Sequence, residues 1–311
     1  MIKLLKNLYQ RITATFSRHR WELKSIKNLD YLVKKEFYIF YLIRFYLKLP
    51  IHYPFPTDRG NQFFYLWDLV AFAPSLKRLS QFDQRLKEMI GEFYIKGVRA
   101  WEYGKFLSLV ELDSHPMILD VGPGSSTFSY YLAHEGARVT TIDLPSPMEA
   151  RWDYKSKRSN VKNVHGTVLA LPFSDNSFNL VMAISTIEHL DTNYPQNKQV
   201  TYDVFIRRTK RAIKEMIRVL KKGGKLYITT DAYLTKQKTD RWKTDVKYRG
   251  IGGAFKFADI RNVLLNTAVR NGCRPVYNTS FSSSKLLDSV HYANYRGRYI
   301  TTVALFCNKV V

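Results

Sequence analysis

The chain of 311 residues is 45% hydrophobic and 24% charged, and its 49 basic and 26 acidic side chains give a net charge of +23. Such a composition is ordinary for a folded globular protein, and the sequence holds no internal repeat or low-complexity tract that would indicate another class. The charge excess favours anionic neighbours, namely nucleic acid, acidic lipid surfaces and phosphorylated or acidic-sugar substrates, but it does not determine the fold.

The first part of the chain, residues 1–115, is expected to form a helical, basic and aromatic-rich N-terminal region. Apolar residues recur there at helical spacing, and two helices are expected at residues 76–98 and 100–112. The first 50 residues contain 11 basic and 3 acidic side chains, a net charge of +8.

From residue 116 onward the pattern alternates between strand and helix. Strands are expected at residues 117–121, 138–144, 163–168, 178–185, 224–231, 274–281 and 299–308. Helices are expected at residues 125–136, 202–222 and 257–272. Such alternation predicts an α/β domain over residues 116–311 with helices on both faces of a mostly parallel sheet. We therefore expect a Rossmann-like, doubly wound, seven-stranded sheet with an antiparallel edge strand.

The two cysteines and the apolar runs bear on the cellular compartment. Cys273 and Cys307 show neither metal-ligand spacing nor a disulfide framework, so we expect structural cysteines in a reducing compartment. The longest apolar run, at residues 36–50, is interrupted by Arg44 and falls short of the about 18 residues of a membrane span. We also find no secretory signal, so the expected location is cytoplasmic or peripheral to a membrane.

A glycine loop follows the first predicted strand, in the sequence "DVGPGSST" of residues 120–127. Gly122 and Gly124 allow a sharp turn and let a ligand lie against the backbone. A dinucleotide fingerprint would have a third glycine where Thr127 stands. Asp143, 19 residues after Gly124, could accept both hydroxyls of a ribose. This carboxylate suits NAD and S-adenosylmethionine equally.

Two later segments, residues 165–190 and 215–230, separate these alternatives. With the glycine loop and the "TIDLP" segment, they resemble the motifs of class I S-adenosylmethionine-dependent methyltransferases, with methyltransferase-11-like motifs in the same order and at similar spacing. The resemblance covers roughly residues 95–308. It implies S-adenosyl-L-methionine as the cofactor, which contains no phosphate and hence does not require the third glycine.

The resemblance also implies which residues contact the cofactor: Asp120, Gly122, Pro123, Gly124, Asp143, Leu144, Thr167, Val168, Leu169, Ile184 and Ser185. Asp120 either supports the loop or reaches the methionine amino group, Asp143 holds the ribose, and Leu144 covers the adenine. Thr167 stands where the family often has an aspartate, so backbone groups of the next two residues would recognise the adenine edge instead.

Candidates for chemistry follow the fourth strand, in "STIEHLDTNYP". We expect His189 to act as a general base or to bind the substrate, with Glu188 and Asp191 as substrate-binding neighbours. A structural role for His189 within its loop is equally consistent with the sequence. Tyr103, in the pre-strand segment "WEYGKF", is a further candidate for ligand contact, although ordinary helix packing also explains it.

Elimination gives a preference for the atom that is methylated. No "NPPY"-like tetrapeptide follows the fourth strand, which disfavours methylation of amino groups on bases. No cysteine lies near the site, which disfavours methylation of base carbons through a covalent intermediate, and no metal-ligand cluster is visible. O-methylation is therefore favoured.

A second basic region accompanies the predicted helix at 202–222. Residues 191–250 contain 16 basic and 6 acidic side chains, a net charge of +10. One helix face is predicted to present Arg207, Arg211, Lys214, Arg218 and Lys222. The opposite, apolar face is predicted to present Phe205, Ala212, Ile213, Met216 and Leu220. The basic face is either simply solvated, or it binds an anionic membrane surface or nucleic acid.

These observations predict an S-adenosylmethionine-dependent methyltransferase that performs O-methylation of a small-molecule, glycan or lipid-linked acceptor. One alternative is an RNA methyltransferase that uses the basic surface. It is less favoured because no RNA-binding module and no aromatic stacking platform are apparent. A second alternative is a non-catalytic, methyltransferase-like binding protein.

Overall fold

The computed structural model describes residues 78–79, 98–112, 115–124, 126–145, 161–193, 198–235, 255–256, 259–276, 293–295 and 298–310. Most of the predicted N-terminal region, with the first of its two expected helices, therefore lies outside the described residues. The second expected helix is α5, Val98–Leu109. The division of the chain at residue 115 stays a prediction.

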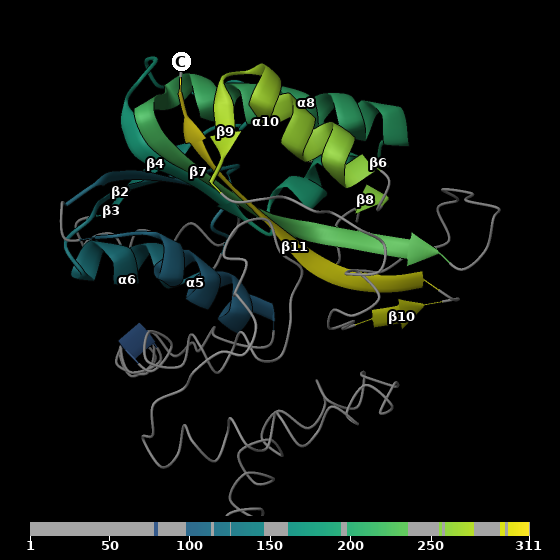
Figure 1. The fold of residues 1–311 in the computed structure, drawn as a ribbon, viewed down its shortest axis with the longest axis horizontal. Helices are drawn as coiled ribbons and strands as arrows, with labels where there is room; N and C mark the ends of the chain where they lie inside the picture. The colour runs from purple at the N-terminus through teal and green to yellow at the C-terminus, as the bar shows by residue number, and fades with distance from the viewer. Residues whose placement is uncertain are drawn as a thin grey trace, which may run out of the picture.

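The centre of the structure is one mixed sheet in which the strands run in the order β10-β11-β7-β4-β1-β2-β3. The strands are β1 Met117–Val121, β2 Arg138–Asp143, β3 Val161–His165, β4 Phe178–Ile184, β7 Leu220–Thr235, β10 Ala293–Tyr295 and β11 Arg298–Lys309. β3, β2, β1, β4 and β7 are parallel, and β11 is antiparallel to β7. The mostly parallel sheet with its antiparallel strand β11 confirms the predicted Rossmann-like fold (Figure 1). Among the described residues the sheet has nine strands instead of the predicted seven, and β10 was not predicted.

Short strands extend this sheet on its antiparallel side. β9 Cys273–Pro275 and β10 both pair with β11, and β8 Phe255–Lys256 runs parallel to β7. The predicted strand over 274–281 is thus observed only in its first residues among those described. The two cysteines, distant in sequence, lie on the paired strands β9 and β11 and are buried. Burial raises the pKa of the Cys273 thiol to about 12, which favours the expected structural role.

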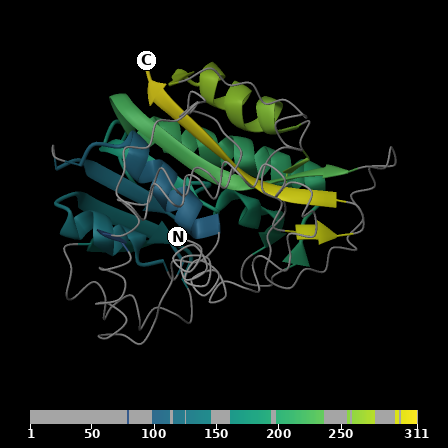
Figure 2. The same ribbon diagram turned by 60° about the horizontal axis from the view of Figure 1, so that its bottom comes forward.

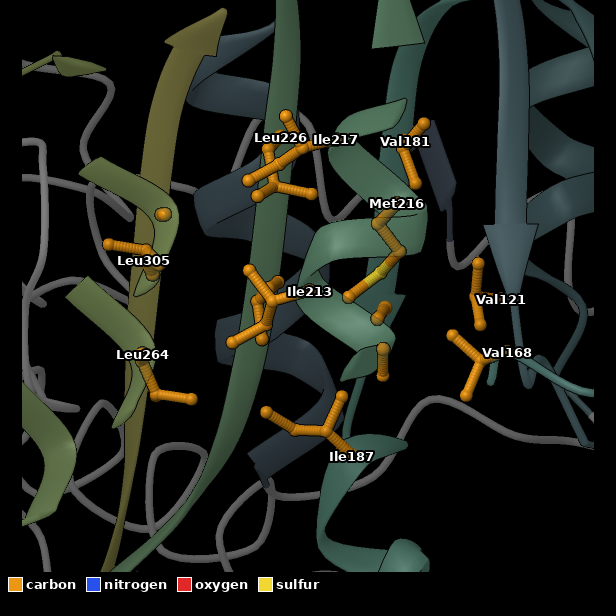
Figure 3. Packing of buried hydrophobic residues seen from close by; sticks show 14 of the residues in the cluster. Val121, Val168, Val181, Ile187, Ile213, Met216, Ile217, Leu226, Leu264 and Leu305 are labelled. Atoms are coloured by element: carbon orange, nitrogen blue, oxygen red, sulfur yellow. The ribbon is translucent and has the colours of Figure 1, made fainter. Parts of the chain in front are cut away.

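Helices cover both faces of the sheet (Figures 1 and 2). α5 and α6 Phe128–His134 lie on one side, and α8 Tyr202–Val219, η3 Ile260–Leu265 and α10 Asn266–Arg270 lie on the other. Figure 3 shows Ile213 and Met216 of α8 packed against Val181 of β4 and Leu226 of β7. No helix within the described residues combines the length and apolar character needed to cross a membrane.

The order of the strands indicates at which edge of the sheet a ligand would bind. β1 lies between β2 and β4. After β1 the chain adds β2 and β3 on one side of β1, and it then crosses to add β4 and β7 on the other side. Ligands of such sheets bind beyond the carboxyl ends of the strands at this point of reversal. Asp120 of β1 is paired with Met182 of β4, so the loops after Val121 and Ile184 emerge next to each other.

The sequence of α8 explains its position over the sheet. Thr201 caps its N-terminus, where its hydroxyl accepts a hydrogen bond from the backbone N–H of Val204 (3.4 Å). The predicted apolar residues are buried as expected: Phe205, Ala212, Ile213, Met216 and Leu220. Arg207, Arg211 and Lys214 are exposed on α8, as predicted for the basic face. Leu220 and Lys222, which were predicted on the same helix, belong instead to β7, because the helix ends at Val219.

Arg218 is a correction to that face, because it serves the fold. Its guanidinium donates to both carboxylate oxygens of Glu215 (3.0 and 2.9 Å) and to Asp175 (2.7 Å). It also donates to the carbonyl oxygens of Phe173 (2.8 Å) and Leu171 (2.9 Å). Simple helical periodicity could not distinguish this arginine from its solvated neighbours, since Phe173, Leu171 and Asp175 lie more than 40 residues away in the sequence and only Glu215 is close.

Replacing Arg218 with alanine should therefore destabilise the protein. We expect a loss of about 2 kcal/mol in the free energy of unfolding, because several carbonyl and carboxylate acceptors lose their donor. Urea denaturation would measure this loss. Arg211→Ala, an exposed arginine on the same helix, is the matched control and should change stability by less than about 0.5 kcal/mol. Equal effects of the two substitutions would contradict the assigned role.

Candidate functional site

The glycine loop joins the ends of three strands. Gly122 and Gly124 have φ angles of +66° and +55°, which are left-handed conformations that favour glycine. The N–H of Gly122 donates to the Ile142 carbonyl (2.8 Å), and its own carbonyl accepts from the Thr186 hydroxyl (3.0 Å). The loop after β1 is therefore fixed against both β2 and the residues that follow β4.

Asp143 lies at the end of β2 with its carboxylate directed to this loop. One oxygen accepts from the N–H of Gly124 (3.0 Å) and the other from the N–H of Leu144 (2.8 Å). Burial raises the pKa of Asp143, while these two hydrogen bonds lower it. Each carboxylate oxygen has lone pairs left for a further donor. The side chain of Leu144 beside it is 37% exposed, so an apolar surface is available next to the carboxylate.

Asp120 is buried at the end of β1, with 3% of its surface exposed. The hydroxyl of Ser129 on α6 donates to its carboxylate. Burial raises the pKa of Asp120 to about 7, against the lowering effect of this hydrogen bond. The contact ties β1 to α6 across the glycine loop, which supports the loop-supporting alternative for this residue. Its contact with a methionine amino group stays a prediction.

The loop after β3 contains the residues predicted at the adenine edge. The Thr167 hydroxyl accepts from the N–H of Leu169 (3.2 Å), and Val168 is buried. Glu215 of α8 accepts from the N–H of Leu171 (2.9 Å), so α8 holds the following turn. The Thr167 side chain and the Leu169 N–H thus already satisfy each other within the loop. Recognition of adenine by this loop stays a prediction.

A buried polar network at the end of β4 was not foreseen from the sequence. Glu102 of α5 has no exposed surface and accepts from the hydroxyls of Ser185 (2.5 Å) and Thr229 (2.6 Å). The Thr229 hydroxyl in turn accepts from the N–H of Ser185 (3.0 Å). Ser185 has a φ of +44°, which is uncommon for a residue with a side chain. The network holds Ser185 in this conformation at the point where the methyl group is expected.

Two neighbours of Glu102 on α5 complete this network. Arg99 pairs with Glu102 (3.0 Å) and also donates to the Ile184 carbonyl (3.1 Å). The Tyr103 hydroxyl is hydrogen-bonded to the Ser126 hydroxyl of the glycine loop (2.7 Å), and its ring stacks on Phe128 at 4.3 Å. α5 therefore bridges the loop after β1 and the residue after β4. Contact of Tyr103 with a ligand stays a prediction.

The three candidate residues after β4 lie on η2, Ile187–Asp191, and differ in burial. Glu188 is 2% exposed and accepts from the Thr230 hydroxyl (3.0 Å), and Asp191 is 5% exposed. Burial and the nearby Asp231 raise the pKa of Glu188 well above its ordinary value. His189 is exposed, and its ring makes no hydrogen bond to the described residues. Of the three, His189 is the side chain that an acceptor could reach without rearrangement.

Desolvation and the positive charge of Arg99 lower the pKa of His189. A neutral imidazole is the form that can accept a proton.

Within the part of the chain that the structure describes, no group of three or more His, Cys, Asp or Glu side chains could hold a metal ion.

Comparison with known proteins agrees with this geometry. Residues 119–228 match the sequence model of a family described as "Methyltransferase domain". These residues are thus similar to methyltransferase domains, and they make up about a third of the chain. The match includes the glycine loop, Asp143, the loop after β3 and the end of β4.

Relatives of the methyltransferase domain are similar over part of their length. A protein of Encephalitozoon cuniculi (strain GB-M1), named a methyltransferase without a substrate, is 42% identical over 80 residues, or 25% of this chain and 32% of that protein. The demethylmenaquinone methyltransferase of Thermobifida fusca (strain YX) is 30% identical over 138 residues, or 43% of this chain and 52% of that protein. The chain thus spans about half or less of these relatives.

A solved structure of a geranyl diphosphate methyltransferase in complex with GPP and sinefungin is also similar to this chain. It has a TM-score of 0.47 and 12% sequence identity, and the similarity covers 65% of this chain and 75% of that one.

S-adenosylmethionine is the cofactor of this methyltransferase family, and the residues of the site fit it. The Asp143 carboxylate can accept from ribose hydroxyls, and Leu144 offers an apolar surface for adenine. Gly124 has no Cβ atom, and the space that a Cβ would occupy holds no protein atom within 4 Å, so a ligand can approach the backbone closely there. No phosphate-binding lysine is needed, because the cofactor contains no phosphate.

Sequence reasoning missed several residues that build the site: Arg99, Ser126, Thr186, Thr229 and Thr230. Glu102 is buried, and its partners are the Ser185 and Thr229 hydroxyls and the Arg99 guanidinium. A charged pair such as Arg99 and Glu102, three residues apart within an aromatic helix, was the available signal. It could have indicated a buried ion pair but not its partners.

Proposed function

We propose that the chain is an S-adenosylmethionine-dependent methyltransferase that transfers the methyl group to an oxygen atom of a small-molecule, glycan or lipid-linked acceptor. The observation that carries this proposal is the Asp143 carboxylate, held by the N–H groups of Gly124 and Leu144 beside an open glycine loop. This geometry suits a ribose diol joined to a ligand that lies along the loop backbone.

Positioning is the main contribution of the chain to such a reaction. When bound, S-adenosylmethionine would supply a methyl group bonded to a cationic sulfur, and the acceptor oxygen would displace that sulfur in line as a neutral thioether. Asp143 would fix the ribose, and Ser185, held by Glu102 and Thr229, would border the reacting centre. Orientation of this kind supplies a large part of the rate in a displacement reaction. His189, exposed and with a lowered pKa, would take the proton of a hydroxyl acceptor.

A second candidate function is methylation of RNA, which one observation supports. Arg207, Lys210, Arg211 and Lys214 are exposed on α8, and no hydrogen bond or ion pair joins them to the described residues. Such a face could follow a phosphate backbone. The oxygen-acceptor proposal is preferred because the described part of this face exposes no aromatic side chain on which bases could stack.

Asp143→Ala should weaken the binding of S-adenosylmethionine by about 100-fold, since two charge-assisted hydrogen bonds to the ribose are lost. Isothermal titration calorimetry of both proteins with S-adenosylmethionine would measure the change. The matched control is Asp203→Ala, an exposed aspartate in the first turn of α8, which should not alter the affinity. A wild-type protein that binds no S-adenosylmethionine would contradict the proposed function.

Transfer itself is tested with methyl-labelled S-adenosylmethionine and panels of hydroxylated small molecules, glycans, lipid-linked glycans and RNA. Label in a hydroxyl-bearing small molecule, glycan or lipid fraction supports the proposal, and label in RNA supports the second candidate. Binding without transfer to any of them would support the non-catalytic alternative. His189→Ala should lower the rate of transfer to oxygen while leaving cofactor affinity unchanged.

A further inference from the structure

Arg99 uses only part of its guanidinium within the protein. Its Nη1 atom donates to Glu102 Oε2 (3.0 Å) and to the Ile184 carbonyl (3.1 Å), which occupies both N–H groups of that atom. The remaining N–H groups belong to Nε and Nη2, and they make no hydrogen bond to any described residue. One edge of the guanidinium is thus held by the protein, and the adjacent edge is not hydrogen-bonded within the described residues.

Arg218 shows what a purely structural arginine looks like in this fold. Its Nε, Nη1 and Nη2 atoms all donate, to two carboxylates and two backbone carbonyls. Arg99, by contrast, donates through one nitrogen atom only, to the completely buried Glu102 and to the Ile184 carbonyl. A role limited to structure therefore leaves the unused edge of Arg99 unexplained.

The exposure of Arg99 and of the charged groups around it also indicates that its guanidinium can contact a ligand. Its side chain is 35% exposed, whereas Glu102, Glu188 and Asp120 are 0%, 2% and 3% exposed. Among these four groups, the guanidinium is therefore the one that a ligand can contact. Its contact with the Ile184 carbonyl places it at the end of β4, and its charge lowers the pKa of Asp120 at the end of β1.

The position of Arg99 identifies the ligand group. The ends of β1 and β4 are where the methionine part of the cofactor is expected, and this part ends in an α-carboxylate. A guanidinium edge with two parallel N–H groups matches a carboxylate in a bidentate manner. We propose that Arg99 binds the α-carboxylate of S-adenosylmethionine through Nε and Nη2, and that Glu102 and the Ile184 carbonyl position it. This inference rests on the proposed function.

The test compares two ligands that differ only in this carboxylate. S-adenosylmethionine and its decarboxylated form, the corresponding sulfonium propylamine, are titrated calorimetrically into wild-type protein and Arg99→Gln. The wild type should bind S-adenosylmethionine roughly 10- to 100-fold more tightly than the decarboxylated ligand. In Arg99→Gln this ratio should fall to about 1, through loss of affinity for S-adenosylmethionine alone.

Two further variants separate charge from geometry. Arg99→Lys retains the charge but not the two parallel donors, so it should restore only part of the ratio. Arg207→Gln, which removes an exposed arginine of α8, should leave both affinities unchanged. The inference is wrong if Arg99→Gln weakens both ligands equally, as a structural role predicts, or if it preserves the wild-type ratio. A wild type that binds neither ligand overturns the proposed function, and this inference with it.

Discussion

Gly122→Ala should lower the affinity for S-adenosylmethionine by at least about 100-fold and destabilise the fold by about 2–5 kcal/mol. Two separate costs combine at this position. The backbone of Gly122 has a φ of +66°, where a residue with a Cβ atom is strained. An added Cβ would also lie 2.2 Å from Cγ2 of Thr186, which is too close for two carbon atoms. The loop must therefore shift, and the cofactor surface shifts with it.

Urea denaturation and calorimetry would measure both effects, and a second substitution would identify the cause. Thr186→Ala removes the Cγ2 atom that the new methyl group meets, so Gly122→Ala/Thr186→Ala should recover part of the lost stability. Gly124→Ala is the control, because an added Cβ meets no atom within 4 Å and only the cost of φ +55° remains. If the double substitution is additive, with no recovery, the contact with Thr186 is not the cause.

The sequence was sufficient for the parts of this protein that depend on local pattern and chain order. Alternation of apolar strands with amphipathic helices predicted the parallel sheet, because each strand must bury both faces. The sheet then fixed where β1 ends, and so placed the loop at Gly122 and Gly124. Asp143 was identified in the same way, as a carboxylate at the end of the neighbouring strand. Each of these inferences requires only a segment and its position in the chain.

The remaining parts of the site depend on contacts between distant segments. Glu102 and Ser185 are 83 residues apart, and Glu102 and Thr229 are 127 residues apart. Nothing in a periodic pattern indicates that a glutamate on a helix before the sheet will accept from hydroxyls at the ends of β4 and β7. Burial was equally difficult to foresee for Glu188, since a carboxylate after a strand is usually solvated. Packing determines such features, and a single sequence does not display it.

Asp120→Asn should gain stability relative to the wild type as the pH rises from about 4 to about 7, measured as the difference between the two free energies of unfolding. Burial raises the pKa of Asp120 to about 7 in the folded protein, above its ordinary value of 3.8. The folded state consequently binds a proton more readily than the unfolded state. This stabilising contribution is complete below pH 3.8 and is lost as pH rises through the folded pKa.

The difference is the appropriate quantity, because other carboxyl groups titrate over the same range. Glu188 also has a raised pKa. Hydrogen bonds from Arg218 lower the pKa of Glu215, so Glu215 contributes stability that is lost as the pH becomes acidic. Asparagine cannot ionise, yet it retains an oxygen that can accept from Ser129. Urea denaturation at pH 4 to 8 should show a relative gain for Asp120→Asn that reaches at most about 4 kcal/mol. A gain that is independent of pH would mean that Asp120 ionises in the folded protein as it does in the unfolded chain. Burial beside the glycine loop would then not disfavour its ionised form.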